Sequence, residues 1–241
     1  MTTLNNQVIL ITGAGGGLGG TAALSLAKRG AQIILLDKII PKLEKVYDAI
    51  VAAGGPEPML YPFDLAGAKE EDYQELADNV ARHYGALQGL LHSAVEFNAY
   101  TPLANQKTQD WGHAFNVNLH AAFLLTRVLL PVLQKSSQAS IVFTTDSTAR
   151  NAYAGAYGVS KIAVEGLAKI LAAELEAGQK VRVNILSPGP VDSPLRRKAY
   201  PAEDKSQILA LSMLEPVYVY LFGEASLGVT GQIIDAQTFK P

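Results

Sequence analysis

Seven short apolar segments recur along the chain, each separated from the next by a longer stretch. They are VILIT (8–12), QIILLD (32–37), PMLYPFD (58–64), GLLHS (89–93), SIVFTT (140–145), VRVNIL (181–186) and GQIIDA (231–236). Nearly continuous apolar runs of this length are typical of strands buried on both faces of a sheet. Helical spacing occupies stretches between them, at 18–29, 41–53, 69–84, 110–135 and 155–177. This alternation predicts an α/β class protein: a doubly wound Rossmann fold with a seven-stranded, mostly parallel sheet and helices on both faces.

The length and composition favour a single domain over 1–241. No internal repeat, low-complexity tract or linker-like boundary interrupts the chain. Between the sixth and seventh predicted strands, 194–228 breaks the rhythm with a long, proline-punctuated stretch of mixed charge. Because an insertion after the carboxyl end of a strand lies where such sheets place their ligand cleft, we interpret 194–215 as a mobile substrate lid.

Charge and composition argue against several classes of partner. The chain has 20 Lys and Arg residues against 22 Asp and Glu residues, a net charge of −2 that provides no field for binding nucleic acid. It has no cysteine, and its four histidines do not form a metal-ligating pattern, so we expect no metal site. The N-terminal segment is polar and no apolar run reaches membrane-spanning length, so a cytoplasmic location without a membrane partner is expected.

A glycine-rich segment, ITGAGGGLGG (11–20), directly follows the first predicted strand and leads into the first predicted helix. Glycines there permit a tight turn and the close approach of a pyrophosphate, whose charge is met by N–H groups at the helix N-terminus. Two overlapping patterns fit, T-G-x-x-x-G-x-G and G-x-G-x-x-G, and glycine spacing alone does not separate them. We expect a dinucleotide cofactor to contact Thr12, Gly13, Gly17, Leu18 and Gly19.

Asp37 ends the second predicted strand, where a carboxylate accepts hydrogen bonds from an adenosine ribose. The same charge would repel a 2′-phosphate, so we predict NAD(H) as the preferred cofactor and NADP(H) as the less favoured one, with Lys38 softening the preference. Asp64 and Leu65, after the third strand, are further candidates for the adenosine end. For Asp64, an adenine contact and an ordinary turn residue stay equally open.

Tyr157 and Lys161 are four residues apart in a predicted helix, so their side chains share a face. A lysine cation beside a phenol favours the phenolate, which makes a proton-transferring base plausible near neutral pH.

Over essentially its whole length, the sequence resembles a short-chain dehydrogenase/reductase of the single-domain branch. The resemblance rests on TGAGGGLG (12–19), Asp64, NVN (116–118), YGVSK (157–161) and SPGPVDS (187–193), in this order. It implies that Tyr157 is the catalytic acid/base, that Lys161 lowers the tyrosine pKa and holds the nicotinamide ribose, and that Asn118 positions a relay water. It also implies cofactor contacts from Ser93, Pro188, Gly189, Val191 and Ser193.

The family carries a serine after its fifth strand that steadies the substrate oxygen, and aligning SIVFTTD on that strand puts Asp146 there. Counting back thirteen residues from Tyr157 selects Thr144 instead, but the loop looks shortened, which favours the strand match. An ionised Asp146 cannot donate a hydrogen bond and would raise the pKa of Tyr157. Three resolutions stay open: Ser147 or Thr145 supplies the hydroxyl, a protonated Asp146 donates, or hydride transfer is impaired.

The sequence therefore predicts an NAD-dependent oxidoreductase that transfers a hydride between the cofactor and a small-molecule alcohol or carbonyl substrate. Its catalytic candidates are Tyr157, Lys161, Asn118, Asp146 and Ser147. The alternative is a dinucleotide-binding sensor or scaffold with little turnover, which Asp146 favours. By resemblance we expect a homodimer or homotetramer built through helices 110–135 and 155–177. The sequence does not identify the substrate.

Overall fold

The computed structural model describes residues 3–178 and 180–240, and within them seven strands form one parallel sheet in the order β3-β2-β1-β4-β5-β6-β7. The strands are β1 (Val8–Thr12), β2 (Gln32–Asp37), β3 (Met59–Pro62), β4 (Gly89–His92), β5 (Ala139–Thr144), β6 (Val181–Ser187) and β7 (Ile233–Asp235). Every neighbouring pair is parallel, as expected for a doubly wound sheet. The predicted fold class is confirmed.

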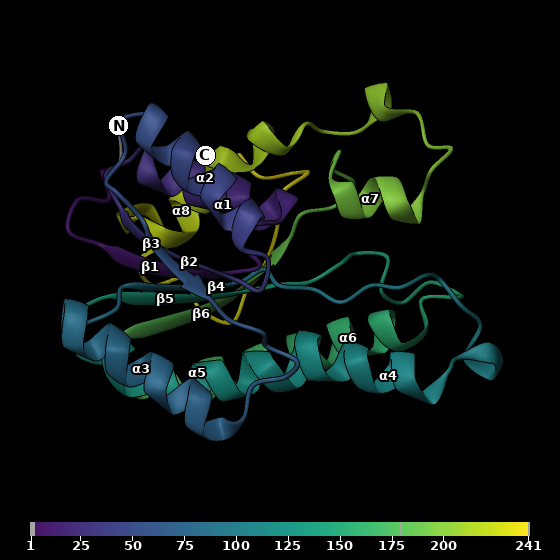
Figure 1. Ribbon diagram of the computed structural model, residues 1–241, viewed down its shortest axis with the longest axis horizontal. Helices are drawn as coiled ribbons and strands as arrows, with labels where there is room; N and C mark the ends of the chain where they lie inside the picture. The colour runs from purple at the N-terminus through teal and green to yellow at the C-terminus, as the bar shows by residue number, and fades with distance from the viewer. Residues whose placement is uncertain (1–2, 179, 241) are drawn as a thin grey trace.

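Helices cover both faces of the sheet (Figure 1). One layer contains α1 (Gly17–Ala27), α2 (Ile40–Ala52) and α8 (Glu215–Phe222), and the other contains α3 (Glu70–Tyr84), α4 (Thr108–Phe115), α5 (Ala121–Leu133) and α6 (Gly155–Leu175). Each layer has its own apolar core against the sheet. Successive strand residues point to opposite layers, which is why the strands are apolar throughout.

The predicted helix 110–135 is divided in the structure. A π-helical turn, Asn116–His120, separates α4 from α5. Such turns are frequent at functional sites, and this one carries Asn118. Pro131 lies in the last turn of α5, and the helix ends two residues later at Leu133.

The apolar stretch Thr108–Leu133 reaches the length and hydropathy of a membrane-spanning helix, contrary to the sequence expectation, but 56% of its apolar window is buried inside the fold. It packs against α3 and α6 as a core helix. The fold itself therefore accounts for its apolar character.

The insertion before β7 contains α7 (Pro194–Ala199), several short 3-10 turns and α8. A single bridge between Val191 and Leu209 ties the insertion to the end of β6. In Figure 1 the α7 segment stands at the carboxyl edge of the sheet, apart from the two helical layers. A cleft of about 440 Å³ lies there, bounded by the glycine-rich loop, the end of β5, the start of α6 and α7.

Candidate active site

The glycine-rich loop passes very close to the end of β4. Gly13 has φ 64°, and a Cβ atom there would lie 2.7 Å from the Cα atom of Ala94. Thr12 braces the same junction, because its hydroxyl oxygen accepts from the Ser93 and Ala94 N–H groups, both at 3.1 Å. Only glycine fits at position 13, and the remaining predicted loop residues, Gly17, Leu18 and Gly19, line the main cleft.

Asp37 lies beside the loop, in a hollow of about 220 Å³ that adjoins the main cleft. Its two carboxylate oxygens accept from the backbone N–H groups of Gly15 and Ile39, each at 3.1 Å. Lys38 and Lys42 line the same hollow. The carboxylate is thus fixed at the end of β2, with two cations near it.

Asp64 and Leu65 also line this hollow, two and three residues beyond the end of β3 at Pro62. An oxygen of Asp64 accepts from the Ala66 N–H group at 3.1 Å, which is a turn contact. Asp64 therefore forms the turn and also faces the hollow, and its contact with adenine stays a prediction.

Ser93 is buried at the end of β4, and its hydroxyl has no hydrogen-bond partner among the described residues. It lines both the main cleft and the neighbouring hollow. An orphaned buried hydroxyl at this position is available to a ligand in the cleft.

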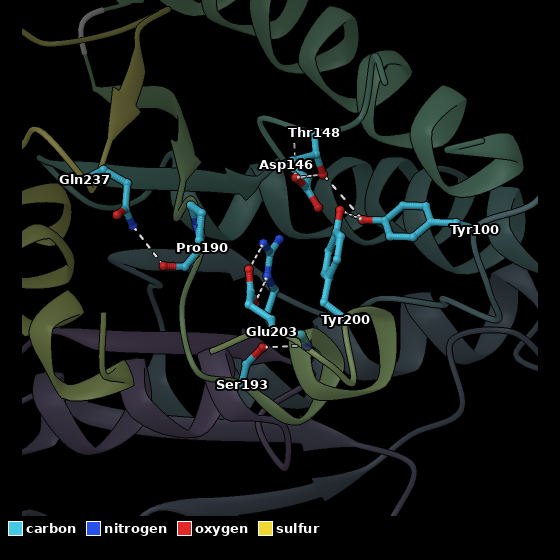
Figure 2. A network of polar contacts seen from close by, with 9 residues as sticks. Tyr100, Asp146, Thr148, Pro190, Ser193, Tyr200, Glu203 and Gln237 are labelled. Carbon is cyan, nitrogen blue, oxygen red and sulfur yellow. Dashed lines mark hydrogen bonds and ion pairs between the residues drawn. The ribbon is translucent and has the colours of Figure 1, made fainter. Parts of the chain in front are cut away.

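The segment after β6 forms the opposite wall of the cleft through Pro188, Gly189, Val191 and Ser193. Gly189 has φ 64°. The Gln237 side-chain amide supports the turn by donating to the Pro188 carbonyl group at 2.7 Å and to the Pro190 carbonyl group at 3.3 Å. Figure 2 shows the bond to Pro190. The Ser193 hydroxyl oxygen caps α7 by accepting from the Arg196 N–H group at 3.1 Å, also drawn in Figure 2. These contacts hold the turn in place without a ligand.

Tyr157 and Lys161 lie one turn apart in α6, as predicted, and both are buried. The Lys161 ammonium donates to the Thr144 carbonyl group at 2.8 Å. Burial lowers the pKa of Lys161 to about 8, against the opposing attraction of Asp146. The lysine is thus fixed to the end of β5 and faces the cleft.

Tyr157 donates its hydroxyl proton to Oδ2 of Asp146, with an oxygen-to-oxygen distance of 2.6 Å. The other carboxylate oxygen accepts from the Thr148 N–H and hydroxyl groups at 2.8 and 2.7 Å. Burial, and then the charge of Asp146, raise the pKa of Tyr157 well above its ordinary value. The conflict expected from the sequence is present in the structure, where Tyr157 is a neutral donor.

The other candidates for the missing serine differ in position. Ser147 is exposed and lines the cleft. The Thr145 hydroxyl donates to Glu165 at 2.6 Å and is therefore engaged. The Thr144 hydroxyl is buried without a partner among the described residues. Asp146, and not Thr144, contacts Tyr157, which favours the alignment on the strand.

Asn118 is buried in the π-helical turn and ties three segments together. Its side-chain oxygen accepts from the Glu96 N–H group at 2.7 Å, and its amide donates to the Glu96 carbonyl and the Ser160 hydroxyl at 3.1 and 2.9 Å. Beside it, a cavity of about 10 Å³ also touches Lys161 and the unpartnered Thr144. That is about the space for one water molecule.

A chain of hydroxyl groups connects the predicted lid to Asp146 (Figure 2). The Tyr200 hydroxyl donates to the Tyr100 hydroxyl at 3.1 Å, Tyr100 contacts the Thr148 hydroxyl at 3.4 Å, and Thr148 bonds to Asp146. Sequence reasoning missed Tyr100 and Tyr200, because they are one hundred residues apart in irregular segments.

The basic run at 196–198 is fully engaged in the structure. Arg196 pairs with Glu203 and its guanidinium stacks 3.7 Å from the Tyr200 ring. Arg197 pairs with Asp192 at 2.7 Å, and Lys198 donates to the Phe97 carbonyl at 2.9 Å. Arg196 thus braces the predicted lid internally, whereas Arg197 and Lys198 connect it to residues outside 194–215.

A glycine loop that a Cβ atom would obstruct, a fixed carboxylate after β2 and an orphaned hydroxyl in the cleft together fit a nicotinamide dinucleotide. With a tyrosine and a lysine at the far end of the same cleft, fold and site define an oxidoreductase of the Rossmann type. The short chain dehydrogenase family profile matches residues 7–204. The chain belongs to the short chain dehydrogenase family.

Individual relatives agree with this assignment. Uncharacterized oxidoreductase YciK of Escherichia coli (strain K12) is 39% identical over 97% of this chain and 93% of its own length. A short chain dehydrogenase of Shigella flexneri, solved in complex with NADP, superposes with a TM-score of 0.94 at 37% identity, covering 98% of this chain and 99% of its own. A short chain dehydrogenase of Escherichia coli CFT073, solved in complex with NADPH, gives a TM-score of 0.94 at 39% identity over 98% of both chains.

Proposed function

We propose that this protein is an NAD-dependent oxidoreductase that interconverts an alcohol and a carbonyl compound, with Tyr157 as the acid/base and Asp146 as the partner that takes its proton. The observation that supports this most strongly is the 2.6 Å hydrogen bond in which Tyr157 donates to Asp146. The cofactor, when bound, would take up or supply the hydride. The chain itself handles the proton.

The direction of that hydrogen bond favours alcohol oxidation. With its own proton directed at Asp146, the Tyr157 oxygen keeps lone pairs that accept a hydrogen bond from a substrate hydroxyl. As the alcohol proton moves to the Tyr157 oxygen, the tyrosine proton moves to Oδ2 of Asp146, so no phenolate is required. Carbonyl reduction is the reverse transfer. The two bonds from Thr148 hold the carboxylate in place throughout.

Lys161 and Asn118 keep supporting roles in this proposal. The lysine, which donates to the Thr144 carbonyl, would hold the nicotinamide ribose. Asn118 positions the water that fits the small cavity beside Lys161. Ser147 is the cleft hydroxyl available to the substrate oxygen.

The NAD preference rests on Asp37, whose carboxylate would face the adenosine ribose and repel a 2′-phosphate. The Shigella and Escherichia coli relatives solved with NADP and NADPH support a nicotinamide dinucleotide in this chain and count against the preference. Lys38 and Lys42 count against it as well. We retain NAD because the carboxylate is the group fixed by two backbone donors.

An uncharged substrate suits the cleft best. Each cation of the run 196–198 already has a partner, so none is left for a carboxylate or phosphate group. Tyr100 and Tyr200 line the cleft beside Tyr157. Phe97 packs edge-on against Tyr157, with 5.1 Å between the ring centroids. A small, partly apolar alcohol would meet aromatic surface and hydroxyl groups there. We propose that 194–215 acts as its lid.

The remaining expectations also stay proposals. Exposed apolar side chains on α5 and α6, including Phe123 and Ile170, support a homodimer or homotetramer through these helices. We propose a cytoplasmic protein without nucleic-acid or membrane partners.

A dinucleotide-binding sensor is the second candidate function. It is favoured by the same bond, because a tyrosine proton held by Asp146 is withheld from a carbonyl substrate. The two candidates share the cofactor site and differ only in turnover.

Turnover is measured as NADH formation from NAD with a panel of uncharged primary and secondary alcohols. We expect one or more to react, and Tyr157→Phe to lower kcat by roughly 10²–10⁴-fold, the usual contribution of a positioned acid/base. Tyr153→Phe is the matched control, since Tyr153 is 62% exposed. Tight NADH binding, with no turnover of these alcohols or of the corresponding carbonyl compounds, would support the sensor.

A further inference from the structure

Glu165 lies on the same face of α6 as Tyr157 and Lys161, because the three residues are spaced four apart. Its carboxylate is buried, with the residue 6% exposed. It lies two helical turns beyond Tyr157, the proposed acid/base. A buried carboxylate is retained only where hydrogen bonds and charge compensate it.

The hydrogen-bond partners of Glu165 lie on either side of Asp146 in the sequence. Oε1 accepts the Thr145 hydroxyl proton at 2.6 Å, and Oε2 accepts from the Arg150 guanidinium at 2.7 Å. One carboxylate therefore holds both ends of the segment 145–150, which carries Asp146 as its second residue. Although burial opposes it, the bonds from Arg150 and Thr145 hold the pKa of Glu165 below its usual range.

The middle of the segment 145–150 also packs closely against α6. The Ala149 carbonyl occupies the space that a Cβ atom on Gly158 would need. Within the segment, Thr148 donates twice to Asp146 and so turns its free oxygen toward the Tyr157 hydroxyl. The position of Asp146 is therefore set by the bonds of the segment ends to Glu165 and by the contact of the segment with Gly158.

We propose that Glu165 is a positioning residue that fastens the segment 145–150 to α6 and thereby keeps Asp146 within hydrogen-bonding distance of Tyr157. The proposal rests on the Tyr157–Asp146 pair of the proposed function, but it does not depend on turnover. Its effect is on the geometry of the pair, because Glu165 itself does not touch Tyr157.

The readout is the Tyr157 hydroxyl proton in one-dimensional proton NMR at neutral pH. A proton held in a short bond to a carboxylate resonates far downfield, and its loss in Tyr157→Phe assigns it. We expect the resonance in the wild-type protein, and its loss or a clear upfield shift in Glu165→Ala. Glu174→Ala, an exposed glutamate on the same helix, is the matched control and should leave it in place.

Two further variants separate positioning from general stability. Glu165→Gln keeps an acceptor for Thr145 and should retain part of the resonance intensity. Arg150→Ala removes the guanidinium that pairs with Glu165. The Arg150 side chain is 59% exposed, so this variant should fold even where Glu165→Ala does not. Thermal denaturation of each variant confirms that a lost resonance is not a lost fold.

The outcomes distinguish the two proposals. If the wild-type protein has no such resonance, the Tyr157–Asp146 pair of the proposed function fails. If the wild-type resonance is present and folded Glu165→Ala or Arg150→Ala keeps it unchanged, the positioning role of Glu165 is overturned alone. If the resonance is lost in folded Glu165→Ala and in folded Arg150→Ala but is retained in Glu174→Ala, the positioning role of Glu165 is supported.

Discussion

The backbone N–H group of Gly15 donates to Oδ2 of Asp37 at 3.1 Å, which ties the glycine-rich loop to the end of β2. The second carboxylate oxygen of Asp37 accepts from the Ile39 N–H group, so the side chain has a single fixed orientation in the hollow of about 220 Å³ beside the loop. The residue proposed to contact the adenosine ribose therefore also shapes the loop proposed to bind the pyrophosphate. Changing it should alter both the strength and the selectivity of cofactor binding.

We expect Asp37→Ser to weaken NADH binding and to strengthen NADPH binding. Removing the carboxylate removes its repulsion of a 2′-phosphate, while Lys38 and Lys42 remain to attract it. The ratio of the two Kd values should change by about tenfold or more, which is about 1.4 kcal/mol. Fluorescence titration measures both constants, with Asp48→Ser, an exposed aspartate on α2, as the control. A wild-type protein that already binds NADPH more tightly would refute the NAD preference.

Gly13→Ala should abolish dinucleotide binding and lower the melting temperature. The φ of 64° disfavours a side chain, and the added Cβ atom would lie 2.7 Å from the Ala94 backbone. Gly112→Ala is the contrasting substitution, because it lies within α4 and its Cβ atom would meet no heavy atom within 4 Å. Helix propensity predicts that it stabilises the protein by up to about 1 kcal/mol. Equal melting temperatures for the two variants would show that the junction with β4 tolerates a side chain.

His92 should make the protein sensitive to acid. Burial, and then the charge of Lys161, lower its pKa from 6.5 to about 3, while its Nε2 contacts the Thr126 hydroxyl at 2.8 Å. Between pH 6.5 and about 3 the unfolded chain binds a proton that the folded chain does not, so stability is lost as the pH falls through this window.

Urea denaturation at pH 6.5 and 5 checks this expectation. His92→Gln keeps a partner for Thr126 but does not titrate, so the wild-type protein should lose about 1.7 kcal/mol more than the variant over that interval. Parallel losses in the two proteins would mean that His92 is not the group responsible.

Asp146→Ser should change how alcohol oxidation depends on pH. In the proposed mechanism the tyrosine proton passes to the carboxylate, so the wild-type rate would need no phenolate. With serine at 146, a neutral Tyr157 has no proton acceptor, and the rate should rise with pH as the phenolate forms. Initial rates of NADH formation from pH 6 to 10 measure the difference. Identical profiles would remove Asp146 from the proton path.

The fold class was predictable from local pattern, because buried parallel strands are apolar throughout and their alternation with helices indicates parallel crossover connections. Strand boundaries were correct within about two residues, as at β3 and β7. The division of 110–135 at Asn116–His120 was not predictable, because the apolar spacing on either side of a π-helical turn is that of an ordinary helix.

The site was only partly predictable, for a related reason. Tyr157 and Lys161 are neighbours within one helix, so their spacing alone brings them together. Three other contacts depend on the paths of irregular segments, which local spacing does not predict. They are the hydrogen bonds of Tyr157 with Asp146, of Tyr200 with Tyr100 and of Thr145 with Glu165. The sequence indicated that Asp146 would raise the tyrosine pKa, but it did not show which oxygen would hold the proton.

The most direct measurement is a pH titration of phenolate absorbance in the NAD-bound protein, taken as a difference against Tyr157→Phe to subtract the other tyrosines. We expect no ionisation of Tyr157 at or below the ordinary tyrosine value of 10, and a lower midpoint in Asp146→Ser, because the carboxylate charge that raises the pKa of Tyr157 is removed. A wild-type Tyr157 that ionises well below 10 would contradict the neutral relay and show that Lys161 outweighs Asp146.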